Sequence, residues 1–246
     1  VVGRVGRERA AIDLETVTIS AGAGSRLDVG AIDAEGQHDD VDEDRAATID
    51  QIAVEAGRNS DVRLHNSGDH GYGWGEHRET SRGQWLDAAS VNQMTVTAAA
   101  GATIDGDTRV FADFAYASKF LNDDEYDGTF PWDFGGGNDY YNNWDFNGLI
   151  DLELNAQAAN SVLTVSGAGR VSGFFFEDNN FSKVDATGLT GGTGLVVFHG
   201  EPWKATGFEF LGSEYADYVI ATEEDDTLEG NGGNDVLAGL AGNDVI

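Results

Sequence analysis

The chain has 246 residues, no cysteine, and 44 acidic against 14 basic side chains, which gives a formal net charge of −30. The acidic surplus excludes electrostatic attraction to nucleic acid or anionic lipid and makes cations the expected partners, and the absence of cysteine excludes disulfides and thiolate metal sites. No apolar run approaches the roughly eighteen residues that cross a bilayer, so we expect no transmembrane segment.

Four segments show the alternating apolar pattern that is typical of strands. They are Val17-x-Ile19-x-Ala21, Ile52-x-Val54-x-Ala56, Met94-x-Val96-x-Ala98 and Leu152-x-Leu154-x-Ala156. Their intervals of 35, 42 and 58 residues suit a solenoid whose coils stack while insertions of unequal length project as loops. The alternative for the second copy is a helix over 46–57, since its apolar residues also fall at helical spacing before Gly57.

Two polar clusters lie between these segments. The run DDVDED at 39–44 has five carboxylates, whose repulsion favours an extended loop that is either simply solvated or loosely binds calcium. His65, His70 and His77 lie in a glycine-rich stretch that could gather around zinc. Their spacing differs from that of H-E-x-x-H, so we expect ordinary surface histidines.

The insertion at 122–148 combines Asp and Asn with large aromatic residues. The rings include Tyr126, Phe130, Trp132, Tyr140, Tyr141 and Trp144. Sugars stack on aromatic faces, so glycan binding is one hypothesis for this segment. The interpretation that we favour is packing onto the solenoid or a neighbouring subunit, because large aromatic residues often anchor contacts.

Aspartates recur every nine residues towards the C-terminus, at Asp217, Asp226, Asp235 and Asp244. An apolar residue stands two positions after each aspartate, and Gly or Ala stands five positions before it. A flexible Gly/Asp-rich tail would not keep these positions in phase. The spacing therefore predicts turns of six residues, in which glycine permits positive φ, alternating with short strands whose apolar residue points inward.

The stretch GNGGNDVLAGLAGNDVI resembles the RTX nonapeptide G-G-x-G-x-D-x-U-x, where U is a large apolar residue. The resemblance implies a parallel β-roll, with calcium between turns eighteen residues apart that pair Asp217 with Asp235 and Asp226 with Asp244. The implied metal-site residues are Gly212, Asp217, Asp226, Gly230, Gly232, Gly233, Asp235, Gly239, Ala241, Gly242 and Asp244. The first two copies depart from the motif because they lack several of its glycines.

The predicted fold is all-β, a parallel β-solenoid with irregular loop insertions that runs into an RTX calcium β-roll. Residues 1–159 form the irregular part and 212–246 form the roll. Residues 160–211 resemble coils of RTX-type bacterial surface-layer proteins through VLTVSGAG and KVDATGLTGG. Because no leader is visible at Val1 and the last repeat stops at Ile246, we expect a fragment whose roll is truncated.

These features favour a structural protein over an enzyme: a calcium-dependent, self-assembling surface-layer or extracellular matrix protein. The resemblance implies type I secretion and a place on the bacterial cell surface. The expected partners are calcium ions, other copies of the chain in a lattice or filament, and surface or matrix polysaccharide, but not nucleic acid.

Two alternatives stay open. One is an RTX adhesin or carbohydrate-binding module that uses 122–148 as its binding face. The other is a polysaccharide-active enzyme with an RTX tail, whose charged residues would have to converge on one face of the solenoid.

Overall fold

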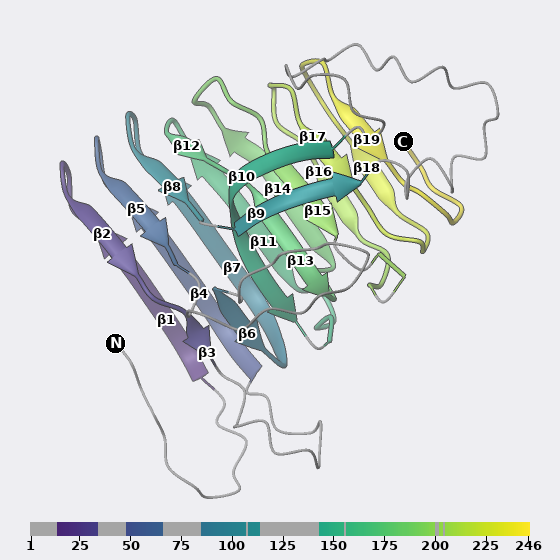
Figure 1. Cartoon of the computed structure of the whole chain (residues 1–246), viewed down its shortest axis with the longest axis horizontal. Coiled ribbons are helices and arrows are strands. Elements are labelled where there is room, and N and C mark those ends of the chain that lie inside the picture. Colours follow the sequence, from purple (N-terminus) through teal and green to yellow (C-terminus); the bar gives the residue numbers. More distant parts are fainter. Residues whose placement is uncertain are drawn as a thin grey trace, which may run out of the picture.

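The structure, a computed structural model, is a stack of β-coils (Figure 1). It describes residues 14–33, 48–65, 85–106, 108–113, 143–154, 156–199, 202–203 and 205–246. These residues form strands and turns without a helix, so the predicted all-β class is confirmed. Accordingly, the described part of the chain contains no helix that is long and apolar enough to span a membrane.

Three sheets make up the stack. The first sheet contains β1 (Leu14–Ala21), β4 (Thr48–Ala56), β7 (Ser90–Ala98), β11 (Val162–Gly167), β14 (Lys183–Leu189), β16 (Glu209–Leu211) and β18 (Thr227–Glu229). The second contains β3 (Ile32–Asp33), β6 (Leu86–Ala88), β10 (Asn143–Leu154), β13 (Phe174–Asp178), β15 (Val196–His199), β17 (Tyr218–Ile220) and β19 (Val236–Ala238), with β9 (Thr108–Asp113) paired to β10. The third contains β2 (Arg26–Val29), β5 (Asp61–Leu64), β8 (Thr103–Asp105) and β12 (Arg170–Val171).

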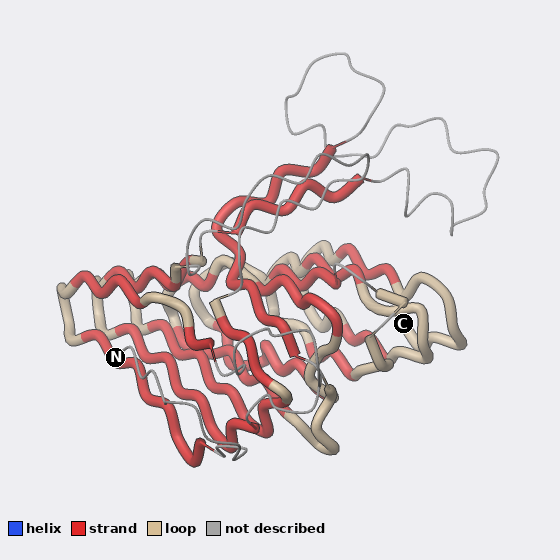
Figure 2. The backbone as a smooth tube through the Cα atoms, turned by 60° about the horizontal axis from the view of Figure 1, so that its bottom comes forward, coloured by secondary structure: helices blue, strands red, loops and turns tan. Residues whose placement is uncertain are grey.

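Each coil visits the sheets in a fixed order. The first four coils pass through the first, third and second sheets, as β1, β2 and β3 do. From β14 onward a coil passes only through the first and second sheets, so the solenoid changes from three sides to two. Neighbouring strands come from successive coils and pair in parallel, apart from the antiparallel pair β9 and β10. The predicted parallel β-solenoid is therefore confirmed, and Figure 2 shows its coils side by side.

The first three alternating segments of the sequence stack in register in the first sheet. Val17 lies beside Ile52, and Ile52 lies beside Met94. The helix alternative for 46–57 is wrong, because β4 is a strand whose side chains from Ile52 to Ala56 alternate between the interior and the outer face. Alternation rather than helical spacing decides this segment because each coil buries one face of the strand.

The fourth alternating segment joins a different sheet from the first three. Leu152 lies in β10 of the second sheet, beside Phe176. The residue that follows Met94 in the first sheet is Leu163 of β11. The period of two correctly identified strands, but it carries no information about which sheet a strand joins. Each of the first four coils contributes one strand to the second sheet, and β10 is that strand in the third coil.

Inward-facing apolar side chains fill the coils. Met94, Val96, Leu163 and Val165 are fully buried, and each such side chain stabilises the fold by roughly 1.5–3 kcal/mol. The upstream coils therefore have a core that needs no metal. The boundaries predicted at 159/160 and 211/212 stay a prediction, because the first sheet continues across both.

One polar network is buried between the sheets. His199, at the end of β15, donates from Nδ1 to the Ile220 carbonyl (2.9 Å), so its Nε2 accepts the amide N–H of Asn180 (3.1 Å). The Asn180 side chain is oriented by Gln157, whose Nε2 donates to Asn180 Oδ1 (2.7 Å). A proton on Nε2 would face this amide donor. Burial lowers the pKa of His199 to about 4, although the bond to the Ile220 carbonyl opposes the shift.

We expect the free energy of unfolding to fall as the pH is lowered from about 6.5 to about 4. In this window the unfolded chain protonates His199 and the folded chain does not, so stability is lost as pH falls; the two pKa values differ by an amount equivalent to roughly 3 kcal/mol. Urea unfolding at pH 7.5 and pH 5 measures the loss. The His199→Gln variant should lose roughly 2 kcal/mol less than the original chain between these pH values. Equal losses in the two proteins would contradict the prediction.

Candidate calcium sites

Four turns of six residues connect the strands of the last coils: turn 1 (212–217), turn 2 (221–226), turn 3 (230–235) and turn 4 (239–244). Each turn ends in one of the repeated aspartates. Val219 pairs with Leu237 and Thr227 bridges Val245, so turn 3 stacks on turn 1 and turn 4 stacks on turn 2. The nine-residue repeat is therefore half a coil, with two turns on each side of the roll.

The structure brings the aspartates of stacked turns together. Asp235 Oδ1 accepts the backbone N–H of Asp217 at 3.0 Å. Asp244 Oδ1 accepts the backbone N–H of Asp226 at the same distance. Carboxylates eighteen residues apart thus lie on one side of the roll, where they repel each other unless hydrogen-bond donors or cations compensate.

Turns 3 and 4 share a backbone conformation. Their second residues, Asn231 and Leu240, have φ of 62° and 63°, and their fourth residues, Gly233 and Gly242, have φ of 112° and 122°. Turns 1 and 2, which are described in full, contain no residue with positive φ. The four repeats therefore form two kinds of turn, a difference that the shared spacing of nine residues conceals.

Close packing between turns requires glycine at the fourth position of turns 3 and 4. A Cβ on Gly233 would lie 2.5 Å from the carbonyl carbon of Tyr215 in turn 1, and one on Gly242 would lie 2.5 Å from the carbonyl oxygen of Glu224 in turn 2. The positive φ of both glycines would also strain any other residue.

The oxygen atoms of turns 3 and 4 fit a hard cation. The carboxylates of Asp235 and Asp244 are only partly buried, and their Oδ2 atoms face Gly230 and Gly239, where a Cβ would collide with them. In the described part of the chain no three His, Asp or Glu side chains gather to hold one metal ion. Backbone carbonyls would therefore supply most ligands, and calcium accepts such mixed sets of six to eight oxygens.

The predicted metal-site residues divide between the two kinds of turn. Those in turns 3 and 4 are Gly230, Gly232, Gly233, Asp235, Gly239, Ala241, Gly242 and Asp244, and those in turns 1 and 2 are Gly212, Asp217 and Asp226. Calcium would add positive charge beside the carboxylates of turns 3 and 4. The protein contributes the turn conformation that presents these oxygens.

Turns 1 and 2 hold their aspartates with hydrogen-bond donors of the chain. Asp217 is 0% exposed and accepts the N–H groups of Leu195 (2.5 Å) and Ser213 (2.7 Å) as well as the Ser213 hydroxyl (3.1 Å). Asp226 accepts the N–H group of Thr222 at 2.9 Å and the Thr222 hydroxyl at 3.0 Å. The sequence prediction missed both hydroxyls, although a Ser or Thr four residues before the aspartate distinguishes these two copies from the others.

Burial raises the pKa of the Asp217 and Asp226 carboxyls. The surrounding N–H and hydroxyl donors lower these pKa values again, and the charges of Asp235 and Asp244 in the stacked turns raise them. Because the pKa in the folded state is raised, the ionised carboxyls reduce stability at neutral pH, and this cost disappears as pH falls below the raised values. The N–H and hydroxyl donors of turns 1 and 2 limit this loss of stability.

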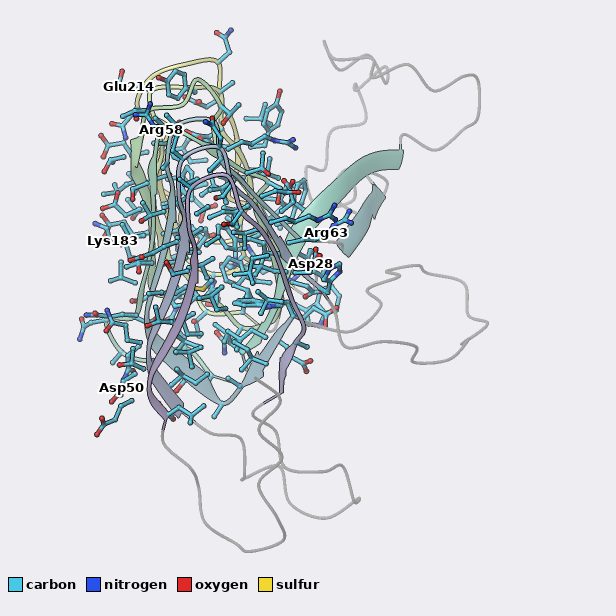
Figure 3. All side chains as sticks on the ribbon, turned by 90° about the vertical axis from the view of Figure 1, so that its left-hand side faces the viewer. Asp28, Asp50, Arg58, Arg63, Lys183 and Glu214 are labelled. Atoms are coloured by element: carbon cyan, nitrogen blue, oxygen red, sulfur yellow. The ribbon has the colours of Figure 1, made fainter. Side chains whose placement is uncertain are left out.

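A separate charged cluster covers the third sheet. Its outer face carries two rows of polar side chains on successive strands. One row consists of Arg26, Asp61, Thr103 and Arg170, and the next consists of Asp28, Arg63 and Asp105, whose charges alternate. His65 Nε2 lies 3.3 Å from Asp28 Oδ1, so this histidine extends the cluster. Figure 3 shows Asp28 and Arg63 on the side of the coil opposite Lys183 of the first sheet.

Several predicted clusters lie outside the described residues. They are the acidic run at 39–44, His70 and His77 of the zinc hypothesis, and 114–142 of the segment that contains the aromatic insertion. The strands on either side of 114–142 are described: β9 and the first part of β10 form a hairpin that projects from the solenoid (Figure 2).

The Asp235→Asn variant tests the calcium site at turn 3. We expect calcium binding at this turn to weaken by roughly tenfold or more, because the substitution removes the only formal charge of the turn. Isothermal titration with calcium measures the effect. Glu229→Gln is the matched control, since Glu229 is an exposed acidic residue of β18 outside the turns. Equal calcium affinity in both variants would contradict a site at turn 3.

Comparison with known families agrees with this geometry. Residues 211–246 match the family model described as the RTX calcium-binding nonapeptide repeat (4 copies). The curated proteins and the solved structures contain no match to the chain. RTX nonapeptides bind calcium, so the predicted cofactor is confirmed, and they are typical of secreted proteins. Residues 211–246 are therefore an RTX calcium-binding β-roll at the end of a parallel β-solenoid.

Proposed function

We propose that the chain is part of a calcium-dependent, self-assembling protein of the bacterial cell surface, either a surface-layer protein or an extracellular matrix protein. The observation that carries this proposal is the continuity of the stack. The first sheet runs from β1 to β18, from the solenoid into the calcium roll, through one series of parallel strands. Calcium binding in the roll can therefore extend a rigid stack that already exists upstream.

The outer face of the first sheet supports assembly. One row across it consists of Thr18, Ala53, Thr95 and Thr164, which are paired in register on successive strands. The small side chains of this row permit another surface to approach the sheet there. The net charge of −30 opposes contact between copies in the absence of cations. Calcium would reduce this repulsion as well as order the roll.

The calcium concentration outside cells suits this coupling. Extracellular calcium modules bind with dissociation constants of about 10⁻⁴ to 10⁻³ M. When free calcium is at ten times the dissociation constant of a site, binding adds about 1.4 kcal/mol to the free energy of unfolding. A few such sites together contribute an amount comparable to a large part of the roughly 5–15 kcal/mol that stabilises a whole domain. Turns 3 and 4 would be disordered before export by type I secretion and would become ordered outside the cell.

Assembly is tested by electron microscopy of the purified chain in millimolar calcium, in magnesium and in EGTA. We expect ordered sheets or filaments in calcium alone, because magnesium demands a stricter octahedral geometry and keeps its water ligands. The Asp235→Asn/Asp244→Asn variant should remain dispersed in calcium. Dispersed monomers of the unsubstituted chain at saturating calcium would contradict the proposal.

A second candidate function is adhesion through carbohydrate. The observation that favours it is the β9–β10 hairpin, which leads towards the aromatic insertion and away from the solenoid. Trp144 lies in β10 of this hairpin. No observation on the described residues favours the alternative of a polysaccharide-active enzyme.

The adhesin function predicts binding of the calcium-loaded chain on a glycan array. The Trp132→Ala and Trp144→Ala variants should lose most of this binding while they keep the β-sheet circular dichroism signal, because the substitutions remove aromatic stacking on the sugar. Trp203→Ala is the control, since Trp203 is 45% exposed and lies outside the insertion. Equal loss in all three variants would count against recognition by the insertion.

A further inference from the structure

Both carboxylate oxygens of the aspartates in turns 1 and 2 are engaged by the protein. Asp217 Oδ1 accepts the N–H of Leu195, Oδ2 accepts the N–H of Ser213, and the Ser213 hydroxyl lies 3.1 and 3.2 Å from the two oxygens. In turn 2, Asp226 makes the corresponding bonds to the N–H groups of Phe208 and Thr222 and to the Thr222 hydroxyl. Neutral donors thus form hydrogen bonds with both of the oxygens through which a carboxylate would bind a metal ion.

The hydroxyl groups are themselves fixed by the backbone. Ser213 Oγ accepts the N–H of Tyr215 at 3.0 Å, and Thr222 Oγ1 accepts the N–H of Glu224 at 3.2 Å. Because this N–H is directed at a lone pair, the hydroxyl proton is free to point at the carboxylate. The resulting turn needs no residue with positive φ, which explains why Tyr215 and Glu224 replace the fourth glycine of the motif.

Turn 1 also uses its carbonyl oxygens for contacts with the chain. The Gly212 carbonyl accepts the side-chain amide of Asn231 (2.8 Å), and the Ser213 carbonyl accepts the N–H of Gly232 (3.1 Å). On the other side of the roll, Asp225 Oδ1 accepts the N–H of Asn243 at 2.7 Å. Direct hydrogen bonds therefore join the first coil of the roll to turns 3 and 4.

We infer that the coil at 212–229 binds no calcium, because hydrogen bonds between its hydroxyl and carboxylate groups stabilise its turns instead. This coil therefore folds with the solenoid. It then serves as the template on which turns 3 and 4 bind calcium. This inference rests on the calcium-dependent folding proposed above. It removes Gly212, Asp217 and Asp226 from the metal-site residues implied by the sequence. Calcium then controls only the coils beyond residue 229.

Hydrogen–deuterium exchange of the full chain in EGTA and in calcium tests the inference directly. In EGTA, peptides that cover 212–229 should stay as protected as those of β14, and peptides that cover 230–246 should exchange at least tenfold faster than in calcium. Protection of 212–229 that arises only with calcium would overturn the inference. If 212–229 is protected in EGTA and calcium produces no assembly, the function proposed above is wrong and the metal-free coil stands.

Substitution of the two hydroxyl groups provides a second measurement. The Ser213→Ala/Thr222→Val variant should bind the same number of calcium ions by isothermal titration and should lose protection of 212–229 in EGTA. The Ser213→Thr/Thr222→Ser variant keeps both hydroxyls and should keep the protection. A reduced number of bound calcium ions in Ser213→Ala/Thr222→Val, measured on chain with a native β-sheet signal in calcium, would show that these turns bind metal and would overturn the inference.

Discussion

The parallel, in-register stacking of coils is the constraint on which the rest of the structure depends. Backbone hydrogen bonds between successive coils place equivalent residues directly above one another. One interior column runs the length of the first sheet and consists of Val17, Ile52, Met94, Leu163, Val184, Phe210 and Leu228. Apolar residues in such a column stabilise one another. The same stacking places equivalent polar residues together, so each buried aspartate of the roll lies near the next one.

The chain solves this problem of stacked aspartates in two ways. The Ser213 and Thr222 hydroxyls, with backbone N–H groups, partly compensate the carboxylates of turns 1 and 2 without a cation. Turns 3 and 4 instead have positive φ at their second and fourth residues and half-buried carboxylates, an arrangement that depends on an external cation. Dependence on calcium is a disadvantage for stability inside the cell. It limits the ordering of turns 3 and 4 to solutions that contain calcium.

The sequence predicted the elements whose spacing is fixed by the stack. The nine-residue repeat was visible because each roll coil has only eighteen residues, and the pattern at Val17, Ile52 and Met94 was visible because a solenoid strand buries every second side chain. The sequence did not show that Leu152 joins the second sheet, because alternation does not identify the sheet. Ser213 was missed because the motif is defined by glycine and aspartate. The missing glycines of the first two copies were therefore interpreted as loss of the motif rather than as a second kind of turn.

The change from three sheets to two explains why polar groups and calcium become important where they do. In the third coil the first, third and second sheets enclose a wide interior, and Trp85, Met94 and Ile104 are fully buried near it. In the roll each strand of three residues contributes one inward side chain, and Leu237 is only partly buried. Apolar burial per residue therefore decreases along the chain while the entropy cost of ordering each residue stays the same. Hydrogen-bond donors in the first roll coil limit the cost of burying its carboxylates, and calcium in the next coil would supply stabilisation that the narrowing core no longer provides.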